Sequence, residues 1–497
     1  MASLQNISPV PPKIEAATAG RVTAQDFYDY EKCPHRVYLN RFGDPSEKLP
    51  KSEFLNLLFE NALLHEWEVV KQLDFETAPG DSLEARACVT LELMKAGVDR
   101  IFQGALLEPD RAGIPDLLEK MPGKSRFGDF FYKPVDIKAG SGYADQAKQS
   151  LREDYGWQLF HYGLLLEQAQ GVFPPEGEIL NKRKERVRYE LAQFRAGYTK
   201  AEAAIRSLAS GTTTDQPANC GECAKCQWWG HCEKDLIAAN DVTLLADIGR
   251  SKKVILNAAG VHSIQQLAAF DFESTKIKGI GTKTSETMKR SAACFLSNTI
   301  KVLSKPQILD PPRKIYLDFE DDPMQDLIYL CGLWIEPPVR GLNYHGLFCT
   351  DEAGEARIWS ELQDMFEALK NEDFAVFHFS AYEKTKITVL EKKYGVRDRD
   401  ALENFRFRMV DLHPLVKNNV VLPARGYGLK KIAPFVGLKY SAANAGGAQS
   451  IVWFQQYQDN PKDTEAMSTL LQYNREDCLA MKYVEEWLRK LTLDDKQ

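Results

Sequence analysis

The chain has 497 residues, more than one ordinary hydrophobic core accommodates, and this length predicts about three domains. Its content of 44% hydrophobic and 27% charged residues is typical of a soluble globular protein, and no run approaches the roughly 20 apolar residues of a membrane span. The net charge of −7 does not indicate nucleic-acid binding, although local basic stretches matter more than the total.

The first hundred residues predict two helices. Residues 1–18 lack a basic segment followed by an apolar one, so we expect no secretory signal and a cytoplasmic location. Thr23 is the predicted N-cap of a helix with Asp26 in its first turn and Cys33 further along. A second helix is predicted over residues 54–73, where His65 and Glu66 interrupt an apolar run.

Two short predicted strands, residues 114–120 and 132–140, carry residues suited to phosphodiester hydrolysis. If the strands are neighbours, Asp116 and Asp136 converge on one Mg²⁺ or Mn²⁺ ion. Lys138 lies two residues beyond Asp136 and therefore on the same strand face, where it can orient a water molecule. Taken alone, an Asp-Ile-Lys sequence is more often a solvated strand with a surface ion pair.

The order of these motifs along the chain narrows the interpretation. Residues 157–162 are predicted to lie in a long helix, with Gln158 and Tyr162 on one face. His, Pro-Asp, Asp-x-Lys and Gln-x-x-x-Tyr in this order resemble the RecB-type nucleases of the PD-(D/E)XK superfamily, which have a restriction-endonuclease-like core. The resemblance implies that His65, Asp116 and Asp136 bind metal, that Lys138 is catalytic, and that Gln158 and Tyr162 lie near the DNA and the active site.

Ten cysteines in a chain expected to be cytoplasmic argue against a disulfide framework. Five are scattered, and most of these are predicted to be small buried residues: Cys88, Cys294, Cys331, Cys349 and Cys478. The other five are Cys33 and the cluster Cys220, Cys223, Cys226 and Cys232, whose close spacing is typical of Zn²⁺ or iron–sulfur ligands.

One N-terminal cysteine followed by Cys223-x-x-Cys226-x5-Cys232 resembles the iron–sulfur subset of RecB-type nucleases. The resemblance implies a [4Fe-4S] cluster held by Cys33, Cys223, Cys226 and Cys232, which staples together the ends of the nuclease domain. Cys220 is then a spare or a substitute ligand. Zn²⁺ remains the alternative, because both metals take thiolates.

Residues 242–260 and 263–270 are predicted to be helical, and a glycine-rich turn precedes another helix. Gly279 and Gly281, with Lys283 beyond them, leave backbone N–H groups free to receive a phosphate. The segment resembles a helix-hairpin-helix motif, which binds the nucleic-acid backbone without reading sequence. A tight connection between two helices also favours glycine. We find no Walker motif and expect no ATP-driven activity.

From about residue 301 the pattern changes to three strands (residues 314–320, 327–336 and 342–350) followed by alternating helix and strand. This succession predicts an RNase H-like core. Asp318 and Glu320 share one strand face, as the start of a two-metal site requires, and Tyr473 and Asp477 share one helix face.

These residues resemble the first and last motifs of DEDD-type 3′–5′ exonucleases in their tyrosine variant. The resemblance implies that Asp318, Glu320, Glu383 and Asp477 bind two metal ions and that Tyr473 positions the attacking water. Glu383 stands where that family has Asp. Asp411 is a further acid that could contribute. A degenerate exonuclease fold, kept for strand binding, is the alternative.

The sequence as a whole predicts an α/β multidomain protein with three parts. Residues 1–240 form the RecB-like nuclease domain, 241–300 the helix-hairpin-helix region and 301–497 the RNase H-like domain. We expect a metal-dependent (exo)deoxyribonuclease that acts on single-stranded DNA or DNA ends in repair, recombination or defence. The alternatives are a nucleic-acid-binding scaffold with silent nuclease sites and an RNA-processing exonuclease that uses the C-terminal domain.

Overall fold

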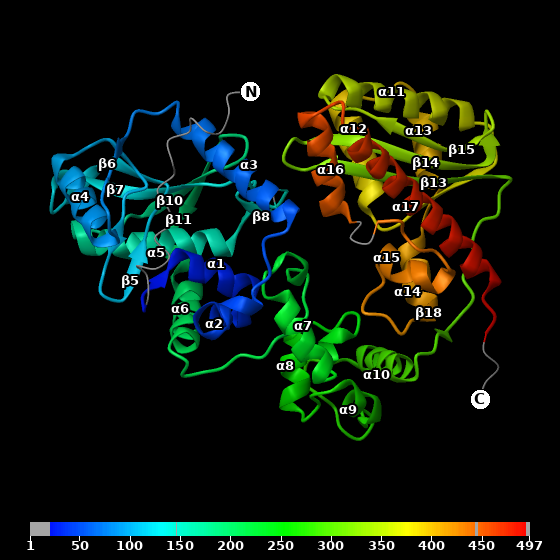
Figure 1. Ribbon diagram of the computed structural model, residues 1–497, viewed down its shortest axis with the longest axis horizontal. Helices are drawn as coiled ribbons and strands as arrows, with labels where there is room; N and C mark the ends of the chain where they lie inside the picture. Colours follow the sequence, from blue (N-terminus) through cyan, green and yellow to red (C-terminus); the bar gives the residue numbers. More distant parts are fainter. Residues whose placement is uncertain (1–19, 146, 443–445, 494–497) are drawn as a thin grey trace. The chain divides into compact units, whose positions relative to one another are not determined.

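The computed structural model describes residues 20–145, 147–442 and 446–493 (Figure 1), so residues 1–18, where no secretory signal is expected, lie outside it. The described chain forms two compact units. The first consists of residues 20–50, 58–217 and 222–231, and the second of the remaining described residues. Among the described residues, no helix combines the length and hydrophobicity that crossing a bilayer requires.

The first unit contains a mixed α/β arrangement. Helix α3 has its first turn in the second unit and the rest of its length in the first. The elements are β1 (Val22–Thr23), α1 (Ala24–Lys32), α2 (Pro34–Phe42), α3 (Glu53–Val70), β2 (Glu76–Thr77), α4 (Leu83–Ala96), β3 (Arg100–Phe102), β4 (Leu106–Leu107), β5 (Arg111–Gly113), β6 (Leu117–Ser125), β7 (Gly128–Ile137), β8 (Tyr143–Asp145), β9 (Ser150–Leu151), α5 (Glu153–Gln170), β10 (Glu176–Leu180), β11 (Arg186–Glu190) and α6 (Arg195–Ala209).

A six-stranded sheet in the order β11-β10-β7-β6-β3-β2 is the centre of the first unit (Figure 1). The β6–β7 hairpin is antiparallel, with Leu117 opposite Val135, and β10 runs parallel to β7, with Leu180 opposite Ile137. Helix α5 packs on this sheet through buried side chains such as Leu159 and Phe160. The two strands predicted from the sequence are therefore neighbours, as the predicted metal site requires.

The helix predicted to begin after Thr23 is confirmed, and its start is capped as expected, but it ends at Lys32, so Cys33, predicted within it, lies in extended backbone between α1 and α2. The Asp26 N–H donates to Thr23 Oγ1 at 3.4 Å, and the Thr23 N–H donates to Asp26 Oδ2 at 2.8 Å. This reciprocal arrangement satisfies two backbone donors that a helix start otherwise leaves open.

The second unit joins a small helical segment to a larger α/β part. Its elements are α7 (Trp229–Ala238), which begins in the first unit, α8 (Arg250–Ala258), α9 (Ile264–Ala269), α10 (Thr282–Ser297), β12 (Lys301–Val302), β13 (Arg313–Asp322), β14 (Leu327–Val339), β15 (Leu342–Phe348), α11 (Glu352–Leu369), β16 (Phe374–His378), α12 (Tyr382–Tyr394), α13 (Arg399–Phe407), β17 (Met409–Asp411), α14 (Leu412–Asn419), β18 (Val420–Val421), α15 (Leu429–Ile432), α16 (Gly447–Asp459) and α17 (Thr464–Lys490).

A five-stranded sheet in the order β15-β14-β13-β16-β17 organises the α/β part. Strands β13, β14 and β15 are antiparallel neighbours, whereas β16 and β17 run parallel to β13. The prediction of three strands followed by alternating helix and strand is therefore confirmed. On β13, Ile315 and Leu317 belong to the core cluster with α11, whereas Tyr316 packs with α17. Alternation then places Asp318 and Glu320 on the α17 side.

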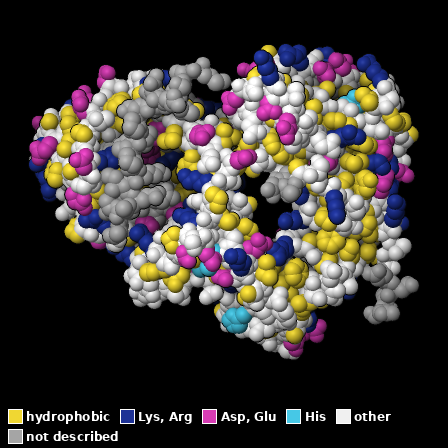
Figure 2. All heavy atoms as spheres, viewed as in Figure 1, with side chains coloured by type: hydrophobic (Ala, Val, Ile, Leu, Met, Phe, Trp, Pro, Cys, Tyr) yellow, Lys and Arg dark blue, Asp and Glu magenta, His cyan; other side chains and the backbone are white. Residues whose placement is uncertain are grey.

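Acidic and basic side chains are interspersed on the surface. Figure 2 shows Lys and Arg beside Asp and Glu over much of the visible face, in keeping with 63 basic and 70 acidic residues. The basic stretch at residues 182–188 follows this pattern, since Arg186 and Arg188 on β11, an outer strand of its sheet, form ion pairs with Glu178 and Glu176.

Candidate metal centres

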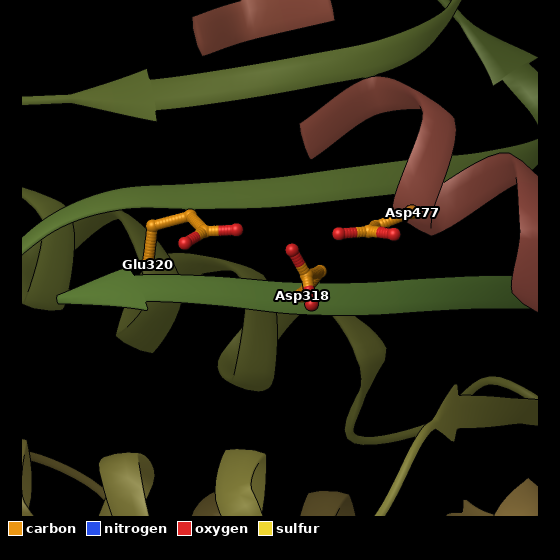
Figure 3. Close-up of side chains that lie close together, drawn as sticks. All are labelled: Asp318, Glu320 and Asp477. Carbon is orange, nitrogen blue, oxygen red and sulfur yellow. The ribbon is translucent and has the colours of Figure 1, made fainter. Parts of the chain in front are cut away.

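Three carboxylates of the second unit converge on one point. Asp318 and Glu320 come from β13 and Asp477 from α17, and one ligand atom of each lies within 4.8 Å of the others. Among the described residues, this is the one group of at least three His, Cys, Asp or Glu side chains that meets this distance. Figure 3 shows the three carboxylates turned toward one another between the strand and the helix. We call these residues the acidic triad.

A polar side chain orients each carboxylate of the acidic triad. Asn474 Nδ2 donates to Asp318 Oδ2 at 2.7 Å, and Ser450 Oγ donates to Glu320 Oε2 at 2.6 Å. The Tyr440 hydroxyl donates to Asp477 Oδ1. These bonds fix the direction of the carboxylates and leave other oxygen atoms facing their common centre.

The acidic triad holds more negative charge than a protein interior tolerates without a cation. Burial, followed by the charge of Asp477, raises the pKa of Glu320 to about 8. Burial and the neighbouring carboxylates likewise raise the pKa of Asp318, and burial raises that of Asp477. A divalent cation bound by these oxygens would relieve the repulsion, so the donor set fits Mg²⁺ or Mn²⁺.

Tyr473 lies beside the acidic triad on the same face of α17 as Asp477. Its side chain is buried, and its hydroxyl accepts a hydrogen bond from Lys430 Nζ. Lys430 Nζ also lies 3.9 Å from Asp477 Oδ2. Burial and the charges of Glu320, Asp477 and Asp318 raise the pKa of Tyr473, so the phenol stays protonated.

Glu383, the predicted fourth acid, lies near the acidic triad but outside the group defined by the 4.8 Å distance. It is buried at the start of α12, where its charge contributes to raising the pKa of Asp318. Its Oε2 atom lies 3.4 Å from His378 Nδ1 and accepts no well-directed hydrogen bond from the described residues. Asp411 has a different role, since its Oδ1 accepts the N–H groups of Ser380 at 2.8 Å and His413 at 3.0 Å.

A second group of charged residues lies at the open end of the β6–β7 hairpin. Asp116 precedes β6 and Asp136 lies near the end of β7, and the Asp116 N–H donates to Asp136 Oδ1 at 3.3 Å. Asp116 Oδ2 accepts the Ile137 N–H at 2.6 Å. Lys138 Nζ lies 2.8 Å from Asp136 Oδ2. We call Asp116, Asp136 and Lys138 the hairpin site.

Electrostatics couple the residues of the hairpin site. Burial, and then the charges of Asp136 and Glu66, raise the pKa of Asp116. Burial lowers the pKa of Lys138, but the two aspartates together outweigh it and hold the pKa above its usual value. The lysine is therefore a permanent ammonium ion, and the Asp136 Oδ2 atom that faces it receives no other hydrogen bond among the described residues. The carboxylate oxygens of the two aspartates are donors that fit a divalent cation.

Three other residues were predicted to belong to the hairpin site, and they differ in how close they lie to its aspartates. Tyr162 lies close, since its hydroxyl donates to the carbonyl of Ile114 at 3.5 Å, and burial and the charges of Asp136 and Asp116 raise its pKa. Gln158 is buried one turn earlier on α5. His65 instead hydrogen bonds to the backbone of Asn181, the residue after β10, and burial is the main cause of its lowered pKa. Its Nε2 atom is buried without a hydrogen-bond partner in the described chain, as a metal-ligating nitrogen would be.

The cysteines predicted to bind a metal are not gathered around one point as the acidic triad is. Cys223 and Cys226 bracket a short 3₁₀ turn in which the Cys226 N–H donates to the Cys223 carbonyl at 3.0 Å. Burial raises the pKa of Cys226, and the charge of Cys33 adds to this. The Sγ atoms of Cys33, Cys223 and Cys226 do not all lie within 4.8 Å of one another. Thiolates bound to a single Zn²⁺ ion would be closer, about 3.8 Å apart, because Zn–S bonds are about 2.3 Å long.

Most of the scattered cysteines are buried, as predicted. Cys294, Cys331, Cys349 and Cys478 are buried, whereas Cys88 is exposed on α4.

The predicted glycine-rich turn connects α9 to α10. Gly279 has a φ of +91°, and a side chain there would be strained and would approach Ile255 Cδ1 to 3.2 Å. Gly281 is the N-cap of α10, with open space around it, and Lys283 is exposed on the first turn. The turn therefore leaves the first N–H groups of α10 accessible.

Several residues around the acidic triad carried no sequence signal. Ser450 reaches Glu320 from 130 residues away, and Tyr440 and Lys430 come from a segment that shows no motif of its own. Asn474 directly follows Tyr473 and contacts Asp318 across 156 residues. In the hairpin site, Glu66 is the additional acid. It lies next to the predicted His65 and accepts a hydrogen bond from Gln103 Nε2 at 2.8 Å.

Comparison with protein families agrees with the fold of the second unit. Residues 315–489 match the family model of the RNase_H superfamily, so the C-terminal domain is RNase H-like. The match contains the whole acidic triad together with Glu383, Lys430 and Tyr473. A search of curated proteins found no match to the chain.

Proposed function

We propose that this protein is a divalent-metal-dependent nuclease that hydrolyses phosphodiester bonds of DNA, in single strands or at ends. The observation that carries the proposal is the convergence of Asp318, Glu320 and Asp477 in an RNase H-like domain. DNA repair, recombination or defence is the setting in which we place this activity.

In the C-terminal site, each residue has a chemical task. The acidic triad would hold the divalent cations, Mg²⁺ or Mn²⁺, which supply a nucleophilic water and polarise the phosphate. The Tyr473 hydroxyl faces the same carboxylates and would orient the attacking water. Glu383, supported by His378 at 3.4 Å, would take part in cation binding from a greater distance, as its longer side chain permits.

The hairpin site supports a second nuclease activity, of the RecB type, in the same chain. The supporting observation is the contact of Lys138 with Asp136 at 2.8 Å, next to Asp116. The two aspartates, with His65 or Glu66 beside them, would hold the cation. Lys138 would orient the attacking water and stabilise the charge that develops on the phosphate. Gln158 and Tyr162 would contact the DNA.

Two further features complete this proposal. Gly279, Gly281 and Lys283 at the start of α10 would bind the DNA backbone through N–H groups and one positive charge.

Cys33, Cys223, Cys226 and Cys232 would hold a [4Fe-4S] cluster, with Zn²⁺ as the alternative. Iron and sulfide analysis of anaerobically purified protein tests the cluster. Cys226→Ser should lose the iron and exposed Cys88→Ser should keep it; zinc in place of iron in the wild type would overturn the cluster assignment.

The decisive experiment compares the two sites on matched substrates. End-labelled single-stranded DNA and RNA are incubated with Mg²⁺ or Mn²⁺ and with wild type, Lys138→Ala or Asp318→Ala. We expect each variant to lose the activity of its own site by about a hundredfold or more. Activity lost only in Asp318→Ala, with RNA preferred, would make the protein an RNA-processing exonuclease. Binding without cleavage by any form would make it a scaffold.

A further inference from the structure

Lys430 occupies an unusual place for a positive charge, at the edge of the acidic triad. It lies on α15, a short helix anchored by the fully buried Ile432. Its ammonium group donates to the Tyr473 hydroxyl and lies 3.9 Å from Asp477 Oδ2. It also lies 4.0 Å from the centre of the Tyr473 ring. The lysine is therefore held against the one tyrosine that we assign to positioning the water.

An ammonium group can only donate hydrogen bonds, so its contact fixes the role of the tyrosine oxygen. The oxygen of Tyr473 must accept from Lys430, and the hydrogen of the hydroxyl must then point elsewhere. An acceptor close to this contact is Asp477, whose Oδ2 atom lies 3.9 Å from the same ammonium group. Lys430 thus directs the hydroxyl of Tyr473 toward the acidic triad.

The charge of Lys430 acts on the same carboxylates. It favours the ionised forms of Asp318, Glu320 and Asp477 and opposes their mutual repulsion. The same positive charge must weaken the attraction of these carboxylates for a divalent cation.

We propose that Lys430 is a positioning residue of the C-terminal site, which acts through Tyr473 by fixing the direction of its hydroxyl group. This inference rests on the proposed nuclease function. Lys430 and Tyr473 then act as a unit during turnover. The charge of Lys430 lowers the affinity of the acidic triad for its cation.

A double-mutant cycle tests whether the two residues act as one unit. The variants are Lys430→Met, Tyr473→Phe and the double variant, all in the full chain, with cleavage measured in Lys138→Ala background. We expect Lys430→Met to lower kcat about tenfold to a hundredfold with little change in KM. In the Tyr473→Phe background the same change should lower kcat less than about threefold. Equal effects in both backgrounds would overturn the proposal.

A second readout does not depend on catalysis. Mn²⁺ affinity is measured by titration of the Lys138→Ala protein. The Asp318→Asn variant shows which of the bound ions belongs to the acidic triad, because only that ion should be lost. Lys430→Met should bind that ion severalfold more tightly, because a like charge has been removed. Lys430→Arg should restore most of the turnover and the weaker affinity. A lysine with a merely structural role would instead lower affinity and thermal stability together when replaced.

Lys431→Met is the matched control, since Lys431 is the next residue of α15 and is exposed. It should leave both turnover and Mn²⁺ affinity unchanged. If Asp318→Asn alters neither cation binding nor cleavage, the proposed function itself fails. If Asp318→Asn abolishes both but Lys430→Met is neutral, only the role of Lys430 is refuted.

Discussion

Gly332 shows how the acidic triad depends on a residue without a side chain. It lies on β14 directly opposite Asp318 on β13. The Asn474 side chain fills the space above it, with Oδ1 accepting the Tyr344 hydroxyl at 2.8 Å and Nδ2 donating to Asp318. Glycine is required because Asn474 can reach Asp318 only by lying against the backbone of β14.

Gly332→Ala should therefore damage the site without touching any of its acids. The new Cβ would lie 1.7 Å from Asn474 Oδ1, so the fully buried asparagine must move and release Asp318. We expect a loss of about 1–3 kcal/mol in the free energy of unfolding and reduced Mn²⁺ affinity, measured by denaturant titration and cation titration. Gly447→Ala, where a Cβ meets nothing within 4 Å, is the control. A fully active and stable Gly332→Ala protein would contradict this account.

Glu320 predicts a pH dependence for the stability of the metal-free protein. Its pKa is about 8 in the folded state against 4.5 for an ordinary glutamate, so between these values the folded state binds more protons than the unfolded state. The free energy of unfolding must then fall as the pH rises through this window. The loss is complete above the folded-state pKa, and a bound cation should abolish it.

Thermal melts in a chelator, from about pH 6 to about pH 9, measure this effect. The melting temperature of the second unit should fall with pH in the wild type and fall less in Glu320→Gln, which carries no charge to repel its neighbours. The exposed Glu361→Gln on α11 should behave like the wild type. A slope that Glu320→Gln leaves unchanged would show that other groups cause the dependence.

At the scale of single elements, the sequence predicted well where local patterning determines the structure. Apolar alternation located β13, the capping residues Thr23 and Asp26 located the start of α1, and the i,i+4 spacing placed Tyr473 and Asp477 on one face of α17. Each of these features depends on residues within a few positions of one another, so the pattern alone is sufficient.

The elements that complete the sites could not be predicted in this way. Lys430 and Ser450 lie on helices α15 and α16, which have no recognisable motif, and they reach the acidic triad only because the chain returns to the sheet before α17. The position of His65 is a similar case. Its helix was predicted, but which of His65 and Glu66 faces Asp116 depends on how α3 rotates against β10. Tertiary packing, which local sequence does not reveal, determines the position of Lys430 and Ser450 and the orientation of α3.

At the scale of the whole molecule, the two candidate metal sites belong to two compact units with separate hydrophobic cores. The hairpin site lies in the first unit, above the cluster that includes Leu117 and Val135. The acidic triad lies in the second, on the α17 face of β13 beside the cluster that includes Tyr316 and Met481. A cation that binds only the folded form of a unit stabilises that unit, by about 2.7 kcal/mol when its concentration is a hundred times the dissociation constant.

Scanning calorimetry of the full chain should therefore show two transitions, both raised by Mn²⁺. Asp116→Asn should abolish the Mn²⁺-dependent rise of one transition and leave the other, and Asp318→Asn should do the reverse, because each variant removes one ligand from one unit. Lys431→Met should retain both rises. A single transition, or loss of both rises in either variant, would mean that the two sites are thermodynamically coupled.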